Sequence, residues 1–299
     1  MRAYLRRRRQ TFIAYGLLSP AFLMVAGLIV YPLYTVFATS LREGRAPNIA
    51  RLDRLPLGFG NFLRALGDEQ VWHSAAVTLF YAAGTIVPSF AIGLGIALLL
   101  NRDFPGRRYV RSLMLLPWAV PGVVAAIAFL WMFDASYGVV NSVLRRLGLI
   151  TSDIAWFVDG DTALYAVLLP TIWKCFPFFT LTLLAALQSV PQALYEAARI
   201  DGAGTTAEFR YVTWPGIRTA AVLAVILQTL WVVKDFDLVF ATTGGGPSRA
   251  TQTLSMFVYE EAFQFFRMGY ASAVGVLMLF VCAGLAFVAM RWGRQQDGQ

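Results

Sequence analysis

The chain alternates long apolar runs with short polar segments, and six of the runs are long enough to cross a membrane as a helix, which takes about 20 residues. None alternates with the period of two that marks a barrel strand, and a helix satisfies its own backbone polar groups in hydrocarbon. The pattern therefore predicts an all-α polytopic membrane protein with six transmembrane helices. The runs cover residues 10–41, 74–101, 112–133, 162–173 continuing past Lys174 to 195, 219–233 continuing past Asp237, and 268–290.

Composition agrees with this class, since 58% of the residues are hydrophobic and only 14% are charged. The mean hydropathy is +0.61. An arginine-rich start before an apolar run also describes a signal peptide, whose apolar core spans about 7–15 residues. Here the uncharged stretch continues through Pro20 and Pro32 to Leu41. We therefore expect a retained first helix, with the two prolines as candidate kinks.

The distribution of arginines predicts the orientation. With six spans both termini share one side, and the larger share of the arginines flanks the spans on that side, including the compact loop at 101–111. Positive residues mark the cytoplasmic side of a membrane protein, so both termini and the polar segment 195–215 are expected in the cytoplasm. The formal net charge of +8 reflects this topology, and no aromatic stacking platform interleaves with the arginines to indicate nucleic acid.

Residue types that carry enzymatic or metal chemistry are scarce. Cys175 and Cys282 lie in different apolar runs, and His73 is the only histidine. These residues offer no disulfide framework, no metal-binding spacing and no histidine-based triad. The sequence also lacks a GxxxxGK[ST] phosphate loop, so we expect no catalytic residue, no metal site and no ATP hydrolysis by this chain itself.

The polar segment between the fourth and fifth runs has its own helical signals. Pro191 suits the first turn of a helix, and Gly202 suits the position just past a helix end. Thr205 and Glu208 have the spacing of a capping box, which predicts a second short helix that stops before Pro215. An ordinary loop of two solvated helical turns would have the same pattern.

This segment resembles the EAA loop of the membrane-spanning permease subunits of bacterial ABC importers. The resemblance rests on Glu196-Ala197-Ala198, Asp201-Gly202-Ala203-Gly204 and Trp214-Pro215. Further motifs resemble the carbohydrate-uptake branch, of the maltose and glycerol-phosphate type, and the likeness extends from about Leu17 to Arg291. These motifs are LLP with Trp118 and Pro121, WKCFPF from Trp173, ALQSVP from Ala186, and FDLVFATTGGGP from Phe236.

The resemblance implies the fold and the partners. It implies an ABC importer permease of the maltose type in the bacterial plasma (inner) membrane, as one transmembrane permease domain over 1–299 with a cytoplasmic EAA loop at 191–215. A second permease subunit would complete the translocation pathway, and an extracytoplasmic solute-binding protein would deliver a sugar or sugar derivative. Thr242 to Thr253 could form part of its docking face. An ABC ATPase dimer would bind ATP and Mg, so the chain itself would need no cofactor.

The EAA loop also supplies candidate ATPase-coupling residues. The small side chains of Ala197 and Ala198 would let their helix enter a groove, while Glu196 and Arg199 could make charged hydrogen bonds at its edge. Gly202 permits the sharp turn that holds the short helix. The full set of expected coupling residues is Glu196, Ala197, Ala198, Arg199, Asp201 and Gly202.

Ionisable and polar residues inside the fourth and fifth runs are candidate substrate ligands. Charge at this depth costs at least about 2.5 kcal/mol per group and usually faces a bundle interior or a wet cavity. Gln228, Trp231 and Asp235 have helical spacing and combine hydrogen-bonding groups with an aromatic plane, which suits a sugar. The predicted substrate-binding set is Lys174, Phe178, Gln228, Trp231, Lys234 and Asp235.

The resemblance adds that, in the maltose-type subunit, positions matching Gln228, Trp231, Val232, Asp235 and 174–178 line the substrate cavity. This chain departs from that subunit at Val232, which stands in place of an amide, and at Lys174 with Cys175, which replace small or apolar residues. The ligand, neutral or anionic, stays open.

Alternative interpretations also stay open. Lys234 could pair with Asp235 or Asp237 simply to hold helices together, Lys174 could extend toward the membrane surface, and Trp231 could be a packing residue. For the whole chain, the alternative is a secondary carrier or an intramembrane enzyme that uses the buried charges.

Overall fold

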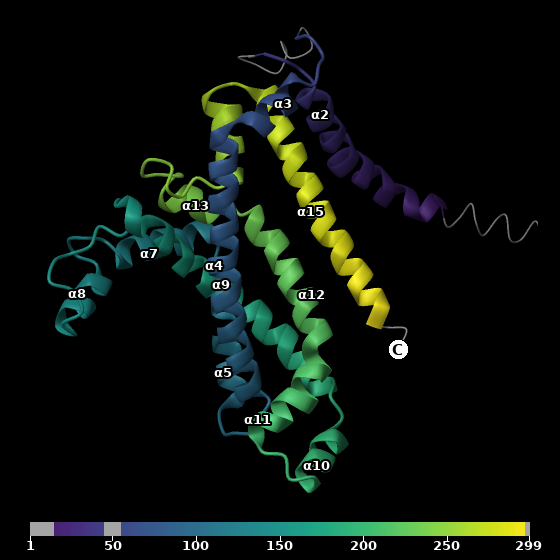
Figure 1. Cartoon of the computed structure of the whole chain (residues 1–299), viewed down its shortest axis with the longest axis vertical. Coiled ribbons are helices and arrows are strands. Elements are labelled where there is room, and N and C mark those ends of the chain that lie inside the picture. Colours follow the sequence, from purple (N-terminus) through teal and green to yellow (C-terminus); the bar gives the residue numbers. More distant parts are fainter. Residues whose placement is uncertain (1–14, 45–54, 297–299) are drawn as a thin grey trace, which may run out of the picture. The chain divides into compact units, whose positions relative to one another are not determined.

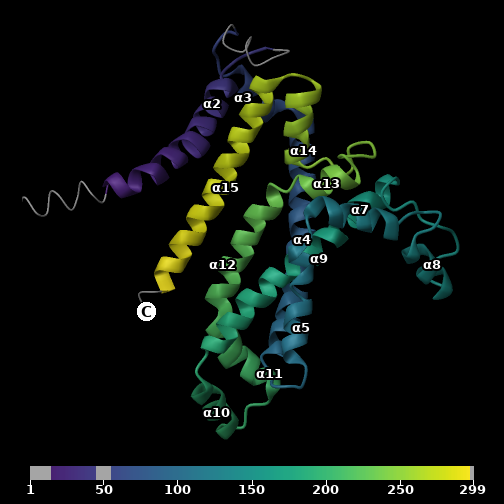
Figure 2. The same cartoon turned by 180° about the vertical axis from the view of Figure 1, so that it is seen from behind.

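The computed structural model describes residues 15–44 and 55–296, which are helical apart from turns and one isolated antiparallel bridge between Arg42 and Leu57. Within these ranges, five helices are long and apolar enough to cross a membrane. Two further helices, bent by 97° at a short break, make a sixth when they are counted as one span (Figures 1 and 2). The prediction of an all-α protein with six spans is confirmed, with the addition that the third span is broken.

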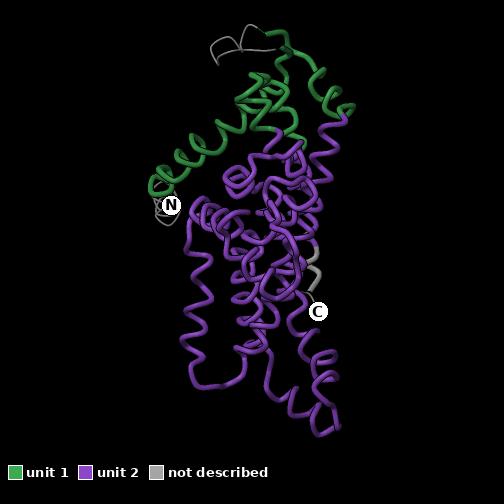
Figure 3. The backbone as a smooth tube through the Cα atoms, turned by 90° about the vertical axis from the view of Figure 1, so that its left-hand side faces the viewer, with its two compact units in different colours: residues 1–68, 258–277 green, residues 69–257, 278–299 purple. Residues whose placement is uncertain are grey.

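The chain divides into two compact units, which Figure 3 draws in different colours. One comprises residues 1–68 and 258–277, and the other comprises residues 69–257 and 278–299. The single permease domain over residues 1–299 stays a prediction.

In the first unit, the first span is helical from Tyr15 to Ser40. The predicted start of this run at residue 10 lies outside the described residues. A π-helical turn, η1 (Ala26–Val30), leads into α2 (Tyr31–Ser40), with Pro32 in the first turn of α2. A π-helical turn and a proline are each recognised places for a helix to bend.

Buried polar contacts hold the remaining elements of the first unit, which include α3 (Gly60–Gly67), η4 (Glu260–Gln264) and the start of α15 (Met268–Gln296). Asn61 Nδ2 donates hydrogen bonds to the carbonyls of Ser40 at 3.0 Å and Arg42 at 2.8 Å. The Tyr270 hydroxyl donates to Asp68 Oδ2 at 2.6 Å. These bonds tie α3 to the end of α2 and to α15.

The second unit is built on three long helices, α4 (Glu69–Leu100), α9 (Gly160–Ser189) and α12 (Trp214–Val233). A Cβ added to Gly93 of α4 would lie 2.5 Å from Phe179 Cβ of α9, so only glycine permits this close approach. Pro170 and Pro177 lie inside α9, and neither of them ends the helix. The pair of α4 and α9 therefore provides a continuous wall on which polar side chains can be placed.

The third span is divided into α5 (Arg107–Leu113), α6 (Leu116–Ala119) and α7 (Gly122–Met132). The bend of 97° falls at Pro121, and a proline inside a helix favours such a break. Beyond the bend, Ala125 and Ala126 of α7 pack on Leu238 of α13 (Asp237–Thr242). The break turns the chain away from the helix axis in the middle of an apolar run.

The fifth run ends earlier than predicted. Helix α12 stops at Val233, Lys234 is its C-cap, and α13 starts separately at Asp237, so the predicted continuation past Asp237 is wrong. Asp235 consequently lies in the turn between two helices and not on the face of α12. Because the helix ends here, the side chain of Asp235 can take a direction that an intact helix would not have allowed.

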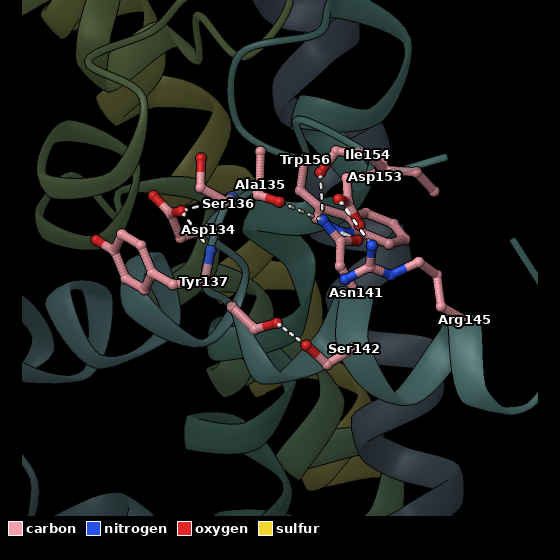
Figure 4. A network of polar contacts seen from close by, with 11 residues as sticks. Asp134, Ala135, Ser136, Tyr137, Asn141, Ser142, Arg145, Asp153, Ile154 and Trp156 are labelled. Carbon is pink, nitrogen blue, oxygen red and sulfur yellow. Dashed lines mark hydrogen bonds and ion pairs between the residues drawn. The ribbon is translucent and has the colours of Figure 1, made fainter. Parts of the chain in front are cut away.

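The segment that follows α7 contains a short helix, α8 (Val139–Arg146). Its network of polar contacts is shown in Figure 4. The buried Asn141 side chain donates to the Ile154 carbonyl at 3.0 Å and accepts from Trp156 Nε1 at 2.8 Å. Arg145 and Asp153 form an ion pair at 3.3 Å. The segment after α7 is thus held together by hydrogen bonds and an ion pair among its own residues.

The EAA loop follows α9 and is helical for most of its length. It contains α10 (Gln192–Ile200), α11 (Thr205–Glu208) and a π-helical segment, η3 (Phe209–Thr213), that runs directly into α12. The helix predicted after Pro191 is confirmed. The prediction that the second helix stops before Pro215 is wrong, because Pro215 lies in the first turn of α12, where a residue without an N–H is tolerated.

Candidate functional site

A cavity of about 280 Å³ lies where the broken third span meets α9, α12 and α13. Four of the six predicted substrate residues line it, namely Lys174, Gln228, Trp231 and Asp235. Phe178 and Lys234 do not line it: the Phe178 ring lies 6.2 Å from the Trp231 ring, and Lys234 is exposed at the end of α12. The structure therefore brings together residues that lie on different elements.

A chain of buried hydroxyl groups holds Asp235. Tyr81 of α4 is fully buried, and its hydroxyl donates to Asp235 Oδ2 at 2.8 Å. The same hydroxyl lies 2.7 Å from Thr171 Oγ1 of α9. Because this network joins three elements of the second unit, it fixes the carboxylate at the cavity wall.

Gln228 is the other buried polar group of the cavity. Its side chain is 5% exposed, its Nε2 lies 2.9 Å from Cys175 Sγ, and its Oε1 has no hydrogen-bond partner in the described part of the chain. Turning the amide over would exchange the two ends and still leave one of them unpaired. An unsatisfied buried polar group costs about 1–3 kcal/mol, which a ligand hydroxyl could remove.

Two indole side chains complete the wall. Trp118 of α6 is 47% exposed and Trp231 of α12 is 51% exposed, and both line the cavity. Their flat apolar faces offer a surface for the C–H faces of a ring. The cavity thus combines an amide, carboxylates and aromatic planes.

The alternative in which Lys234 pairs with Asp235 or Asp237 is not found. The structure describes Lys234, Asp235 and Asp237, and no ion pair joins the lysine to either aspartate. Instead Asp235 and Asp237 both line the cavity, the first bonded to Tyr81. In an intact helix Lys234 and Asp237 would lie on the same face, but α12 ends at Val233 and their side chains are separated.

Several lining residues were not among the predicted ligands. Thr171 and Asp237 reach the cavity, and Tyr81 reaches it through Asp235. Tyr81 and Thr171 carry no signal of this role, because isolated hydroxyl residues are common in apolar helices. Trp118 and Gly122 could have been found, since they flank the proline that breaks the third span.

The EAA loop forms a second candidate region of the same unit. Both α10 and α11 lie at one end of that unit (Figures 1 and 2). Helix α10 ends in a paired set of hydrogen bonds, from Ala203 N to Ala198 O at 2.9 Å and from Gly202 N to Arg199 O at 3.0 Å. Gly202 has φ of 81°, so the predicted glycine helix end is confirmed.

An ion pair crosses the turn of the EAA loop. Arg199 Nε donates to Glu208 Oε1 at 2.7 Å, and this hydrogen bond raises the already high pKa of Arg199. The capping box expected for Thr205 and Glu208 is wrong: Gly204 is the N-cap of α11, and no side chain caps it. The carboxylate of Glu208 bonds Arg199 instead of capping the helix. The Tyr195 hydroxyl adds a second link, 3.2 Å from Thr213 Oγ1.

The side chains of α10 face outward. Of the predicted coupling residues, Glu196, Ala197, Arg199, Asp201 and Gly202 are exposed, and Ala198 is half-buried. Ile200 is 86% exposed and Leu194 is 52% exposed, although both are apolar. The prediction omitted these two residues.

Comparison with known proteins gives one family. The model of "Binding-protein-dependent transport system inner membrane component" matches residues 89–295. The sulfoquinovosyl glycerol transport permease of Agrobacterium fabrum is 36% identical, over 95% of this chain and 91% of its own. The trehalose/maltose permease of Thermococcus litoralis is 33% identical, over 96% and 95%. The diacetylchitobiose permease of Streptomyces coelicolor is 30% identical, over 99% and 91%.

Solved structures share the fold. A chain of a bacterial ABC transporter involved in the import of the acidic polysaccharide alginate superposes with a TM-score of 0.82, covering 99% of both chains at 21% identity. A second structure of an alginate transporter, with an alginate-pentasaccharide-bound periplasmic protein, gives 0.81 over 97% of this chain and 96% of that chain.

Proposed function

Because the chain belongs to the family of inner-membrane components of binding-protein-dependent transport systems, we propose that it is the permease subunit of an ATP-driven sugar importer. With a second permease it forms the translocation pathway, and an extracytoplasmic binding protein delivers the ligand. A partner ATPase dimer binds ATP and Mg and supplies the energy. Three relatives at 30% identity or above are named for sulfoquinovosyl glycerol, for trehalose and maltose, and for diacetylchitobiose. These names support a sugar or sugar derivative as the ligand.

The single observation that carries the proposal is the cavity lined by α9, α12 and the broken third span. A sugar needs directional hydrogen bonds and an apolar plate, and polar walls discriminate strongly against analogues that lack the matching hydroxyl. Gln228 and Asp235 supply the hydrogen-bonding groups and Trp231 supplies the plate, with Phe178 packed on its ring. The Lys174 ammonium has three N–H groups, and one of them can bond the ligand.

The EAA loop is the proposed contact with the ATPase. The short exposed helix α10 carries Glu196, Ala197 and Ala198, and its apolar Ile200 is 86% exposed. Such a helix can enter a groove of a partner protein. Gly202 and the ion pair of Arg199 with Glu208 hold α10 at a fixed angle to α12, so that movement of the ATPase can be transmitted to the spans.

Purification of the tagged chain from its native membrane tests the proposal. We expect a second permease and a soluble ATPase to copurify, and we expect the reconstituted assembly to take up a sugar only with ATP and the binding protein. Transport by the isolated chain in response to a proton gradient, without an ATPase, would contradict the proposal and support a secondary carrier.

A further inference from the structure

The break in the third span leaves backbone carbonyls without helical donors. In an intact helix the carbonyl of Pro117 would accept from the N–H of residue 121, but residue 121 is proline and has none. Val120, the C-cap of α6, has an extended ψ of 128°, so its carbonyl also leaves the helical ladder. A carbonyl that is buried without a hydrogen-bond partner costs several kcal/mol.

Lys174 of α9 supplies the missing donors. Its Nζ donates to the carbonyl of Val120 and, at the longer distance of 3.4 Å, to that of Pro117. A lysine ammonium has three N–H groups, so one is left over. The preceding residue, Trp173, packs against the cluster of Ala125, Ala126 and Leu238, and its ring lies 5.8 Å from that of Phe129. Two consecutive residues of α9 thus hold both sides of the break.

The same break supplies one wall of the cavity. Trp118 precedes Pro121 and Gly122 follows it, and both line the cavity together with Lys174. If the freed carbonyls lost their donor, the break would have to straighten, move or admit water to satisfy them. Either response would displace Trp118 and Gly122 from the wall.

We infer that Lys174 is a positioning residue, which clamps the broken third span to α9 by bonding the carbonyls of Pro117 and Val120. The main role of this lysine is therefore to bond the backbone of the third span, and contact with a ligand is secondary. The inference rests on the geometry of the break and goes beyond the proposed function, which needs only that the cavity exists.

Distance measurements between spin labels test the clamp in the purified assembly. Labels at Val123 of α7 and Leu169 of α9 report on the break, and labels at Leu79 of α4 and Leu169 serve as the control pair, since all three residues are exposed. A Cys282→Ala background avoids labelling that cysteine, and Cys175 is buried. We expect Lys174→Met to broaden or shift the first distance distribution and to leave the control unchanged, whereas Lys174→Arg keeps both.

A second substitution at the break sharpens the test. Pro121→Ala restores the backbone N–H that the Pro117 carbonyl lacks, so in this background Lys174→Met should disturb the distances and the yield of folded assembly less. If Lys174→Met alone gives no assembly, recovery of the assembly by Pro121→Ala supports the clamp, and absence of any recovery contradicts it.

Two outcomes separate the clamp from the transport function. Loss of uptake by Lys174→Met with unchanged distances would show that the lysine acts on the ligand; the clamp would be overturned and the importer would stand. Failure of the wild-type assembly to transport any of a panel of neutral and anionic glycosides would count against the proposed function, while the distances would still decide the clamp.

Discussion

The EAA loop and the cavity differ in how the chain builds them. The predicted coupling residues lie within seven consecutive positions, 196–202, and nearly all are exposed on one short helix and its end. The cavity draws its residues from α6, α7, α9, α12, α13 and the turn between the last two, at positions between 118 and 238. A local site depends on helix propensity and turn chemistry, whereas an assembled site depends on where helices break and how they pack. Substitutions in the two regions should therefore fail in different ways.

The largest effect is expected at the turn of the EAA loop. Gly202 has φ of 81°, and a Cβ there would meet no atom within 4 Å, so the penalty for Gly202→Val comes from the backbone alone. A β-branched residue disfavours this conformation, by about 1–2 kcal/mol or more. We expect normal membrane insertion with loss of uptake and of ligand-stimulated ATP hydrolysis in the reconstituted assembly.

Gly204→Val is the matched control for that turn. Gly204 also has open space at its Cβ, but its φ of −79° and ψ of 172° suit a β-branched residue. If both variants lost coupling equally, or if Gly202→Val kept it, the turn would not be what holds α10.

The next largest effect is expected in the cavity, at Gln228. Replacing this residue by Leu removes a buried amide whose one end is unpaired, so we expect thermal stability to stay equal or rise. Uptake should fall by roughly 10–100-fold, because a hydrogen bond to the ligand is worth about 1.4–2.8 kcal/mol on this scale. Uptake kinetics and a melting curve on the same preparation measure both.

Thr229→Val is the control on the same helix. Its hydroxyl bonds the Val225 carbonyl and does not line the cavity. A fall in uptake as large as that of Gln228→Leu would indicate a general response of α12 and would remove the argument for a specific ligand contact.

A smaller effect is expected at Tyr81, which supports the cavity without lining it. Tyr81→Phe removes the hydrogen bond to Asp235 and the contact with Thr171, so the carboxylate loses its fixed position. A buried hydrogen bond to a charged group is worth about 1.5–3 kcal/mol, and we expect uptake to fall by about tenfold with some loss of stability. Unchanged uptake would show that Asp235 needs no anchoring.

The smallest effect is expected at the ion pair of the EAA loop. Arg199→Glu places like charges together, and we expect a several-fold weaker coupling between ATP hydrolysis and uptake, which the double swap Arg199→Glu with Glu208→Arg partly restores. The arginine is exposed, so the melting temperature should change little. Equal coupling in the single and double variants would argue for direct contact of Arg199 with the ATPase.

Salt should weaken this pair, whereas titration of the arginine should not. Because the hydrogen bond with Glu208 raises the pKa of Arg199 from an already high value, its contribution is present below the unfolded pKa and is lost only as the pH rises through the folded one. Titration of the arginine is therefore not expected to affect coupling near neutral pH. High ionic strength screens exposed charges, so coupling of the wild type should approach that of Arg199→Glu as salt is added.

The helical class, the six spans and the end of α10 could be predicted from the sequence because each depends on neighbouring residues. Runs of apolar residues give spans, and a glycine after a helical segment gives its end. The early end of α12 and the bond between Arg199 and Glu208 could not be predicted in this way. In each case the local sequence allows two arrangements, and tertiary packing selects one of them. The same pattern of Thr205 and Glu208 would serve a capping box if no arginine were nearby.

The sequence by itself determined that this chain is a membrane protein with a short polar helix between its fourth and fifth spans, because hydropathy and turn residues act locally. Only the tertiary structure decided that the bend in the third span reaches 97°, that Lys174 bonds the carbonyls freed there, and that Tyr81 reaches Asp235. These contacts join residues 54–154 positions apart, and nothing in the local pattern shows which distant donor will satisfy a given buried acceptor.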